Sequence, residues 1–332
     1  MKEKMWGLLV HLSKNMWLPK RESLPFDDDF WTYILEESVK TGINTIILDV
    51  GDGIEYASHP EIAMKGAWTR ARVRQEVERC KKLGIALIPK LNFATPHDHW
   101  LGEYARMIST TTYYKVCNDL IKEVYELFDH PEYIHLGMDE EDARHVQKHD
   151  YAVYRQGDLF WHDLRFLVDC VRDTGAMPFM WGCPLYRHFD EYKKHFTPDE
   201  CVLSPWAYNA FNKEHWTPIE SRADYVAYYN EGEYAKLGIK YVEEDPYLVM
   251  FREVSPKVCE EGYKLVPCAS VYNRCEWNHM DLLEYFKELA SDEQILGYVS
   301  APWCDTTPNE RSKMFYEETF RFFREARDKF YN

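Results

Sequence analysis

The sequence predicts an α/β fold, a single (β/α)8 TIM barrel that spans residues 1–332 as one domain. Eight short apolar runs recur along the chain, and amphipathic stretches with helical spacing separate them. Continuous apolar runs are typical of parallel strands that are buried on both faces. A chain of 332 residues accommodates such a barrel, whose usual length is about 250 residues before insertions. The alternative is an open doubly wound sheet, but the sequence lacks a glycine-rich phosphate loop.

The eight predicted strands are distributed over the whole chain, and no linker rich in Pro, Gly or Ser divides them. They cover residues 6–11, 44–50, 85–91, 133–138, 177–181, 201–206, 264–270 and 295–301. The longest irregular segments, 51–68, 92–112 and 183–200, each follow a strand. We therefore expect them on the C-terminal face of the barrel, where active sites of this fold are built.

Helices are predicted between the strands from the 3.6-residue spacing of apolar side chains and from capping residues. They cover residues 30–39, 69–83, 116–127 and 160–171, and a last helix begins at the capping box of residues 307–310. We expect additional helical material in residues 219–262.

Charge and composition exclude several classes of partner. The net charge of −16 disfavours nucleic acid and anionic membrane surfaces. No apolar run approaches the roughly 18 residues that a membrane-spanning helix needs. The first residues lack the pattern of a secretory leader, and the nine cysteines are scattered without a CxxC pair. We therefore expect a cytoplasmic protein with reduced thiols.

Carboxylates, imidazoles and aromatic rings gather at the C-terminal ends of the predicted strands, the positions that carry chemistry in a barrel. They belong to Asp49, Asp52, His97, His135, Asp139, Glu140, Trp181, Trp206, Tyr208, Trp303 and Asp305. Central carboxylates with surrounding tryptophans are typical of a sugar site, because pyranose faces stack on indole rings and hydroxyls need polar partners. The sequence therefore predicts a carbohydrate site at this end of the barrel.

The adjacent pair Asp139 and Glu140 is the candidate catalytic centre. Glycosidic cleavage needs an acid for the leaving oxygen and a second group that stabilises the oxocarbenium-like centre. Two carboxylates in one site also push their pKa values apart. Successive strand residues point to opposite faces, so both serve one site only if the ladder has ended or bulged at Gly137 and Met138. The alternative is that residues 139–142 are the solvated cap and first turn of a helix.

Residues 135–140, His-Leu-Gly-Met-Asp-Glu, resemble the His-x-Gly-Gly-Asp-Glu signature of glycoside hydrolase family 20, the β-N-acetylhexosaminidases. Weaker matches follow in chain order. Residues 88–97 are similar to the family's Ile-Pro-Glu…Pro-Gly-His, and residues 177–181 to its strand-five Trp. Residues 203–208 are similar to its Ser-x-x-Trp-Tyr, and residues 297–305 to its final Gly…Trp-x-Glu.

Four positions depart from the family pattern. Met138 stands in place of the second glycine, Lys90 in place of the strand-three Glu, and Ala207 in place of a Tyr, with Tyr208 displaced by one. The first strand, which ends at residues 11–14, lacks the Arg that family members use on sugar hydroxyls. We therefore expect a divergent member with its own sugar preference.

The resemblance implies an exo-acting hydrolase that removes a terminal β-linked N-acetylhexosamine from an oligosaccharide or glycoconjugate, without a cofactor or a metal. The substrate's own 2-acetamido oxygen would attack the anomeric carbon, and the configuration would be retained. Asp139 would orient the acetamido group, and Glu140 would act first as general acid and then as base. Whether the sugar is gluco- or galacto-configured stays open.

The resemblance also implies roles in substrate binding for the other candidates. Tyr208 would hold the acetamido carbonyl, and Asp305 would bind the distal hydroxyls. The terminal sugar would lie against the three tryptophans, Trp181, Trp206 and Trp303. The remaining candidates for substrate binding are His97, His135 and Asp52. Of these, His135 is favoured as a brace for the Asp139 region.

Other functions stay open on the sequence. One is a glycosidase for sugars without an acetamido group, and another is a metal-dependent hydrolase that combines His97 and His99 with Asp49 or Asp139. A third is a carbohydrate-binding barrel without turnover, which Lys90 and Met138 favour. The phenylalanines of residues 315–330 serve either the core or a homodimer contact.

Overall fold

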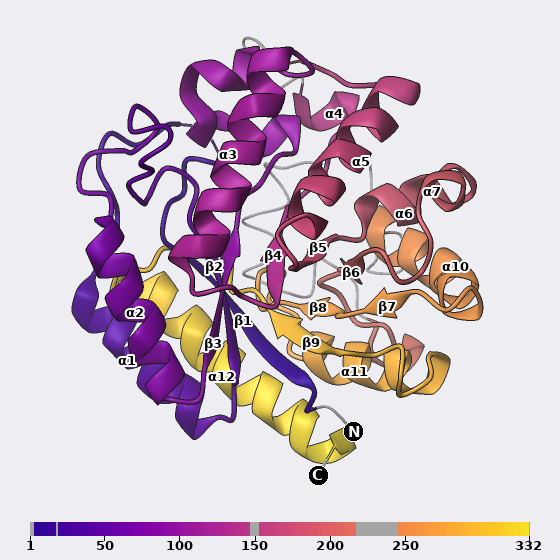
Figure 1. Ribbon diagram of the computed structural model, residues 1–332. Coiled ribbons are helices and arrows are strands. Elements are labelled where there is room, and N and C mark those ends of the chain that lie inside the picture. Colours follow the sequence, from indigo (N-terminus) through magenta and orange to yellow (C-terminus); the bar gives the residue numbers. More distant parts are fainter. Residues whose placement is uncertain (1–2, 18, 147–152, 217–244, 332) are drawn as a thin grey trace.

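The computed structural model describes residues 3–17, 19–146, 153–216 and 245–331, and they contain one curled sheet of nine parallel strands (Figure 1). The strands are β1 (Met5–His11), β2 (Thr45–Asp49), β3 (Ala86–Lys90), β4 (Tyr133–His135), β5 (Met177–Trp181), β6 (Val202–Ser204), β7 (Lys264–Leu265), β8 (Cys268–Ala269) and β9 (Gly297–Ser300). Their spatial order is β7-β6-β5-β4-β3-β2-β1-β9-β8. From β1 to β7 this order follows the chain without the reversal of a doubly wound sheet, so the sheet is of the α/β-barrel type.

The strand predicted at residues 264–270 is divided into β7 and β8 around Pro267, which has no backbone N–H to donate. β7 pairs with β6 and β8 pairs with β9. Single bridges add Cys268 to Trp206 on one side and Leu265 to Ile295 on the other. This one segment therefore contacts the strands on both of its sides.

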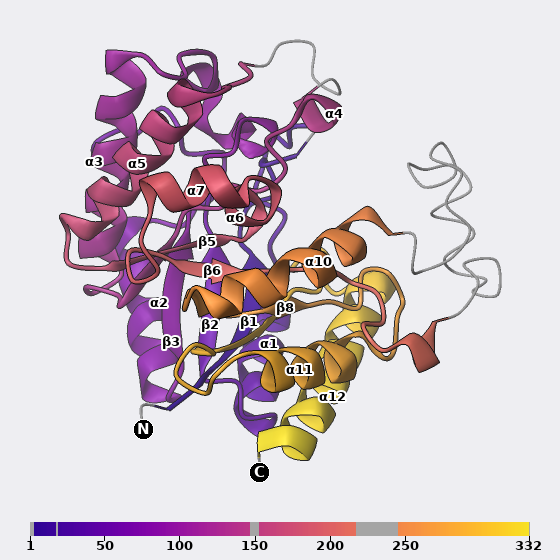
Figure 2. The same ribbon diagram turned by 90° about the vertical axis from the view of Figure 1, so that its right-hand side faces the viewer.

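Helices surround the sheet on its outer side (Figures 1 and 2). The longer ones are α1 (Asp28–Lys40), α2 (Arg70–Lys82), α3 (Thr111–Leu127), α5 (Asp158–Arg172), α10 (Pro246–Glu260), α11 (Asn278–Leu289) and α12 (Glu310–Tyr331). The shorter ones are α4 (Ala143–Val146), α6 (Cys183–Arg187), α7 (Phe189–His195), η1 (Thr95–His97), η2 (His99–Arg106) and η3 (Lys213–His215). The alternation of strands and helices predicted from the sequence is confirmed.

Side-chain caps fix where several helices begin. Thr69 accepts a hydrogen bond from the Arg72 N–H at the start of α2, as the sequence predicts. The last helix begins later than predicted, because Asn309 accepts the Ser312 N–H and α12 starts at Glu310. α10 forms the end of the predicted helical segment 219–262, and residues 217–244 lie outside the described residues.

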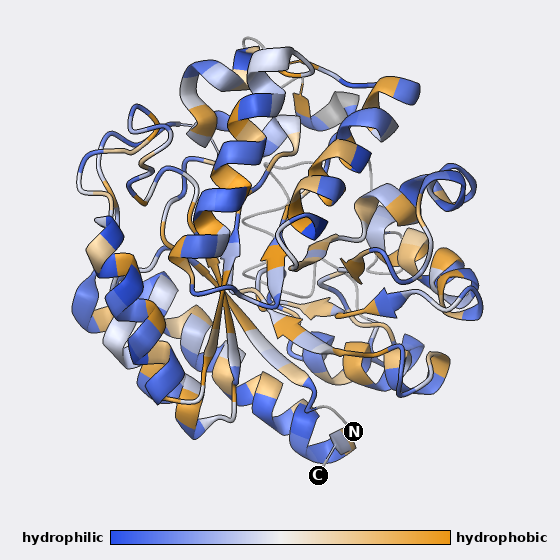
Figure 3. Ribbon diagram, viewed as in Figure 1, coloured by the Kyte–Doolittle hydropathy of each residue, from blue (hydrophilic) through white to orange (hydrophobic). Residues whose placement is uncertain are grey.

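The core lies between the strands and the inner faces of the helices. Most strands are largely apolar, and the helices are apolar on one side and hydrophilic on the other (Figure 3). Phe315, Phe320 and Phe323 of α12 are buried in this core, where Phe323 contacts Trp6 of β1. Core packing therefore accounts for these three rings. Within the described ranges, no helix combines the length and the apolar character needed to cross a membrane.

Candidate active site

Four titratable side chains form a row at the C-terminal ends of β1 to β4. The strand register pairs His11 with Asp49, Asp49 with Lys90, and Lys90 with His135. All four are buried. The Lys90 ammonium forms an ion pair with Asp49, whose carboxylate lies 3.4 Å from Nδ1 of His11. We call these residues the buried row.

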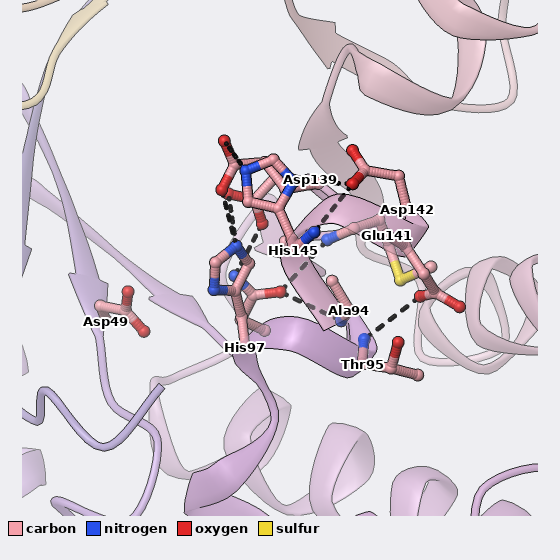
Figure 4. Close-up of polar contacts among 12 residues, drawn as sticks. Asp49, Ala94, Thr95, His97, Asp139, Glu141, Asp142 and His145 are labelled. Carbon is pink, nitrogen blue, oxygen red and sulfur yellow. Dashed lines mark hydrogen bonds and ion pairs between the residues drawn. The ribbon is translucent and has the colours of Figure 1, made fainter. Parts of the chain in front are cut away.

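The environment fixes the charges of the buried row. Burial lowers the pKa of both His11 and His135, so both rings are neutral at pH 7. Burial would raise the pKa of Asp49, but Lys90 and His11 outweigh it and hold that pKa below its usual value. Lys90, the departure at strand three, is thus neutralised by Asp49, which lies apart from the Asp139 cluster in Figure 4.

The backbone turns away from strand geometry directly after β4. Gly137, Met138 and Glu140 have φ values of 72°, 66° and 57°. A Cβ on Gly137 would lie 2.1 Å from Oδ1 of Asn92, so glycine is required there for both space and conformation. The ladder has therefore ended before Asp139, which removes the geometric objection to two adjacent carboxylates in one site.

His97 brings the two candidate catalytic carboxylates together. Its Nε2 lies 3.2 Å from Oε2 of Glu140 and 3.6 Å from Oδ2 of Asp139. Asn92 of the segment after β3 donates from Nδ2 to Oδ1 of Asp139 at 2.8 Å. Figure 4 shows His97 and Asp139 close together, with His145 beside them. Asp139 and Glu140 therefore lie in one site. Asp139 precedes α4 and its carboxylate accepts a hydrogen bond from Asn92, so it is not a solvated helix residue.

A second histidine, which the sequence analysis missed, contacts Glu140 from α4. Nε2 of His145 lies 3.2 Å from Oε1 of Glu140, and its Nδ1 lies 2.9 Å from Oδ1 of Asp142. Asp142 also forms an ion pair with Arg187 of α6. Tyr247 of α10 donates to the same Oε1 of Glu140 at 2.8 Å. One local feature of the sequence could have indicated this contact. His145 comes five residues after Glu140, just past an acidic run that caps a helix.

These contacts decide where the protons lie. Burial would raise the pKa of Glu140, but His145 and His97 outweigh it and hold that pKa well below its usual range. Burial would lower the pKa of His145, but its bonds to Asp142 and Glu140 raise that pKa to about 9. Burial would also lower the pKa of His97, but Asp139 and Glu140 outweigh it and raise that pKa. These shifts favour a protonated His145 and an ionised Glu140 in the free protein.

Glu141, the next acidic residue, has a structural partner. Its carboxylate accepts hydrogen bonds from Nε and Nη2 of Arg155 at 2.6 and 2.5 Å, and from the Thr95 N–H at 3.2 Å. Arg155 is buried and also donates to the Phe93 carbonyl at 3.0 Å. Glu141 therefore ties the turn after β4 to the segment after β3.

The predicted aromatic residues lie side by side around this cluster. Trp303 has its ring centroid 5.6 Å from that of Trp181 and 6.4 Å from that of Tyr208, which stacks on Trp206 at 5.2 Å. The buried Nε1 atoms of Trp181 and Trp206 have no hydrogen-bond acceptor among the described residues. Burial raises the pKa of Tyr208 well above its usual value, so its hydroxyl keeps its proton and can donate.

Trp17 is a further aromatic residue of the site that the sequence analysis missed. It lies in the loop after β1, with its ring centroid 5.9 Å from Trp303 and 6.4 Å from His97. No periodic pattern marks it, since its place depends on the course of an irregular loop.

The two remaining predicted carboxylates have different surroundings. Asp305 lies 2.8 Å from the Lys14 ammonium and 3.6 Å from the Arg21 guanidinium, so cations of the loop after β1 face it. Asp52 is fully buried and accepts hydrogen bonds from Ser13 at 2.5 Å and Asn15 at 2.7 Å. These contacts make Asp52 a brace between the loops after β1 and β2, and its predicted role in substrate binding stays a prediction. His135 accepts the Gly137 N–H at 3.0 Å, which is the bracing contact expected for it.

Comparison with known proteins finds relatives by structure alone. No protein-family profile and no curated protein sequence matches the chain. The N-acetyl-β-hexosaminidase of Streptomyces plicatus aligns over 97% of this chain and 63% of its own, with a TM-score of 0.62 and 11% identity. Dispersin B aligns over 98% of this chain and 99% of its own, with a TM-score of 0.59 and 12% identity.

A glycoside hydrolase family 20 exo-β-N-acetylglucosaminidase from Vibrio harveyi aligns over 99% of this chain, with a TM-score of 0.58 and 12% identity. The chain spans 57% of the length of that enzyme. At these identities the likeness shows the fold, and the chain is similar in fold to the barrels of family 20 enzymes.

Proposed function

We propose that this protein is a glycoside hydrolase that removes a terminal β-linked N-acetylhexosamine from an oligosaccharide or glycoconjugate by substrate-assisted hydrolysis. The observation that carries the proposal is the placement of Asp139 and Glu140. Both are within reach of His97 at the end of β4, beside the ring of Trp181, Trp206, Tyr208 and Trp303. The fold shared with family 20 structures supports it as an analogy.

In the first step, the acetamido oxygen of the substrate attacks the anomeric carbon, and the bond from that carbon to the leaving oxygen breaks. Asp139, held by Asn92, orients the acetamido group and balances the positive charge of the oxazolinium that forms. Tyr208 is a protonated donor suited to the acetamido carbonyl. The attacking atom is thus part of the substrate, so neither carboxylate has to form a covalent bond.

Glu140 passes a proton to the leaving oxygen in this step and takes one from water in the next. We infer that this proton reaches Glu140 from His97 or His145, because each imidazole lies 3.2 Å from its carboxylate. Water then attacks the anomeric carbon from the leaving-group side, Glu140 accepts its proton, and the oxazolinium opens with retention of configuration.

We infer that the sheet is an eight-stranded closed barrel and that residues 1–332 are one catalytic domain. The support is the segment of β7 and β8, which pairs with β6 on one side and with β9 on the other. Counted as one strand, it brings the strand number to eight. The active site then occupies the C-terminal end of that barrel.

The test is a panel of nitrophenyl β-glycosides, with and without a 2-acetamido group, assayed with the wild-type protein and with Glu140→Gln. We expect nitrophenol release from the N-acetylglucosaminide or the N-acetylgalactosaminide alone, and its loss in the variant. Equal turnover of plain glucosides and galactosides would contradict the acetamido mechanism. Binding of N-acetylhexosamines in calorimetry without any turnover would identify a carbohydrate-binding barrel instead.

A further inference from the structure

We propose that His97, Asp139 and Glu140 also bind a divalent metal ion of the zinc type, and that this ion blocks hydrolysis. The three residues are called the metal cluster below. The binding claim stands on the geometry of these side chains alone. The blocking claim rests on the proposed function, because it concerns the groups that hydrolysis would use.

The spacing of the polar atoms fits a small metal ion. Two ligands about 2.0–2.1 Å from a tetrahedral zinc ion are about 3.3 Å apart. Nε2 of His97 lies 3.2 Å from Oε2 of Glu140 and 3.6 Å from Oδ2 of Asp139, and ligand atoms of these three residues lie within 4.8 Å of one another. Nε2 of His145 lies outside this group and holds the other oxygen of Glu140 at 3.2 Å.

The surroundings orient these atoms as partners orient metal ligands. Carboxylate ligands of a metal are usually held by further hydrogen-bonding partners. His145 holds Glu140 in this way, and its own Nδ1 lies 2.9 Å from Asp142, which Arg187 holds in turn. Asn92 fixes Asp139 through its other oxygen at 2.8 Å. Nδ1 of His97 is buried and has no hydrogen-bond partner among the described residues.

The buried row shows why the metal belongs in this cluster and not beside it. There the Lys90 ammonium already occupies the oxygen of Asp49 that faces His11, so a dication would meet a fixed positive charge. Glu140 and Asp139 instead face imidazoles, which become neutral ligands when they release a proton. Among the described residues, the group of His97, Asp139 and Glu140 is the one with ligand spacing.

A bound ion would stop hydrolysis because it uses the same atoms. An ion on Glu140 takes the oxygen lone pair that carries the proton to the leaving group. An ion on Asp139 takes the oxygen that orients the acetamido group. The metal and the sugar therefore compete, and the ion is an inhibitor and not a cofactor.

The test is isothermal calorimetry with zinc chloride on the full chain after removal of metals with a chelator. We expect one zinc ion per chain, and at least about tenfold weaker binding in His97→Gln, in His145→Gln and in Asp142→Asn. His59→Gln is the matched control, because His59 lies 3.2 Å from each of two carboxylates, Glu61 and Asp119, without forming a metal group. Circular dichroism verifies that each variant is folded.

The proposed site would be overturned if the wild-type protein binds no zinc. It would also be overturned if neither His97→Gln nor His145→Gln changes the zinc affinity. For the blocking claim, zinc should raise KM for a nitrophenyl N-acetylhexosaminide with kcat unchanged, and saturating N-acetylglucosamine should weaken zinc binding. Activation by zinc, or zinc affinity that is indifferent to the sugar, would overturn that claim. Because calorimetry needs no turnover, a failure of the proposed hydrolase function leaves the metal result readable.

Discussion

Two groups of buried charge lie at the same end of the sheet, and they differ in the kind of cation that faces the carboxylate. In the buried row, Asp49 faces the ammonium of Lys90. In the cluster after β4, Glu140 faces the imidazoles of His97 and His145. Both carboxylates have a depressed pKa, and both would be costly to bury alone.

The difference separates a structural ion pair from a reactive one. The Asp49–Lys90 ion pair joins β2 to β3 and lies apart from the Asp139 cluster, so we assign it a structural role. An imidazole releases its proton near neutral pH, so Glu140 has partners that can supply the proton needed for acid catalysis. The two groups should therefore respond to mutation in opposite ways, one through stability and the other through turnover.

Lys90→Met has the largest expected effect on stability. It leaves Asp49 charged and unpaired inside the protein, which should cost about 3–5 kcal/mol of the free energy of unfolding. Urea denaturation measures the loss. The double variant Lys90→Met/Asp49→Asn should recover most of it, because no charge remains to be paired. If the double variant is as unstable as Lys90→Met alone, the loss of the Lys90–Asp49 ion pair is not the cause of the lower stability.

Glu140→Gln should instead act on turnover. Removal of a general acid and base should lower kcat on an N-acetylhexosaminide by about 10²–10⁴-fold. The free energy of unfolding should fall by less than for Lys90→Met, because Gln keeps the shape and a hydrogen-bonding amide although the charge contacts with His97 and His145 are lost. Parallel measurement of kcat and of the urea midpoint checks both statements. A variant with normal kcat would remove Glu140 from the mechanism.

Gly137→Ala should distort the turn that places the two carboxylates. The positive φ alone costs an alanine roughly 1–2 kcal/mol, and here the new Cβ would also meet Asn92. Gly84→Ala is the matched control, because φ at Gly84 is +74° and a Cβ there meets nothing within 4 Å. Thermal unfolding should show a clearly larger loss at Gly137, together with a fall in kcat. Equal losses of thermal stability in the two variants would mean that Asn92 can move away from the new Cβ at no measurable cost.

His145→Gln should change the pH dependence of stability by the smallest amount, on the order of 1 kcal/mol. The folded-state pKa of His145 is raised to about 9 from an ordinary value of 6.5. Its proton therefore stabilises the fold fully below pH 6.5, and this contribution is lost as the pH rises through about 9. Unfolding curves from pH 6 to pH 10 should decline less for the variant than for the wild type. An identical dependence of stability on pH in the two proteins would contradict the assignment of a stabilising proton to His145.

The sequence predicts the sheet better than it predicts the site. Buried parallel strands are continuous apolar runs, and all eight predicted runs contain strand residues. The division of residues 264–270 follows from Pro267, but its pairing with both neighbours depends on the curvature of the sheet. α12 begins later than the sequence predicts, because its first turn is capped by Asn309 and not by Thr307.

At the site, positions next to strand ends were predictable and positions in irregular segments were not. Trp181 ends β5, and Asp139 and Glu140 come four and five residues after the end of β4, so the strand assignment places all three at the C-terminal edge of the sheet. Trp17 lies in a loop, and Tyr247 reaches Glu140 from 107 residues further along the chain. His145 lies close in sequence, but the backbone reversal at Gly137, Met138 and Glu140 decides its contact.

The most direct test of the central claim weakens the nucleophile within the substrate. Nitrophenyl hexosaminides with acetamido, fluoroacetamido, difluoroacetamido and trifluoroacetamido groups differ in the electron density of the carbonyl oxygen and little in shape. If that oxygen attacks the anomeric carbon, kcat/KM should fall along the series by at least about 100-fold, a barrier increase of about 2.7 kcal/mol. Equal kcat/KM values across the series would show that the acetamido group is not the nucleophile.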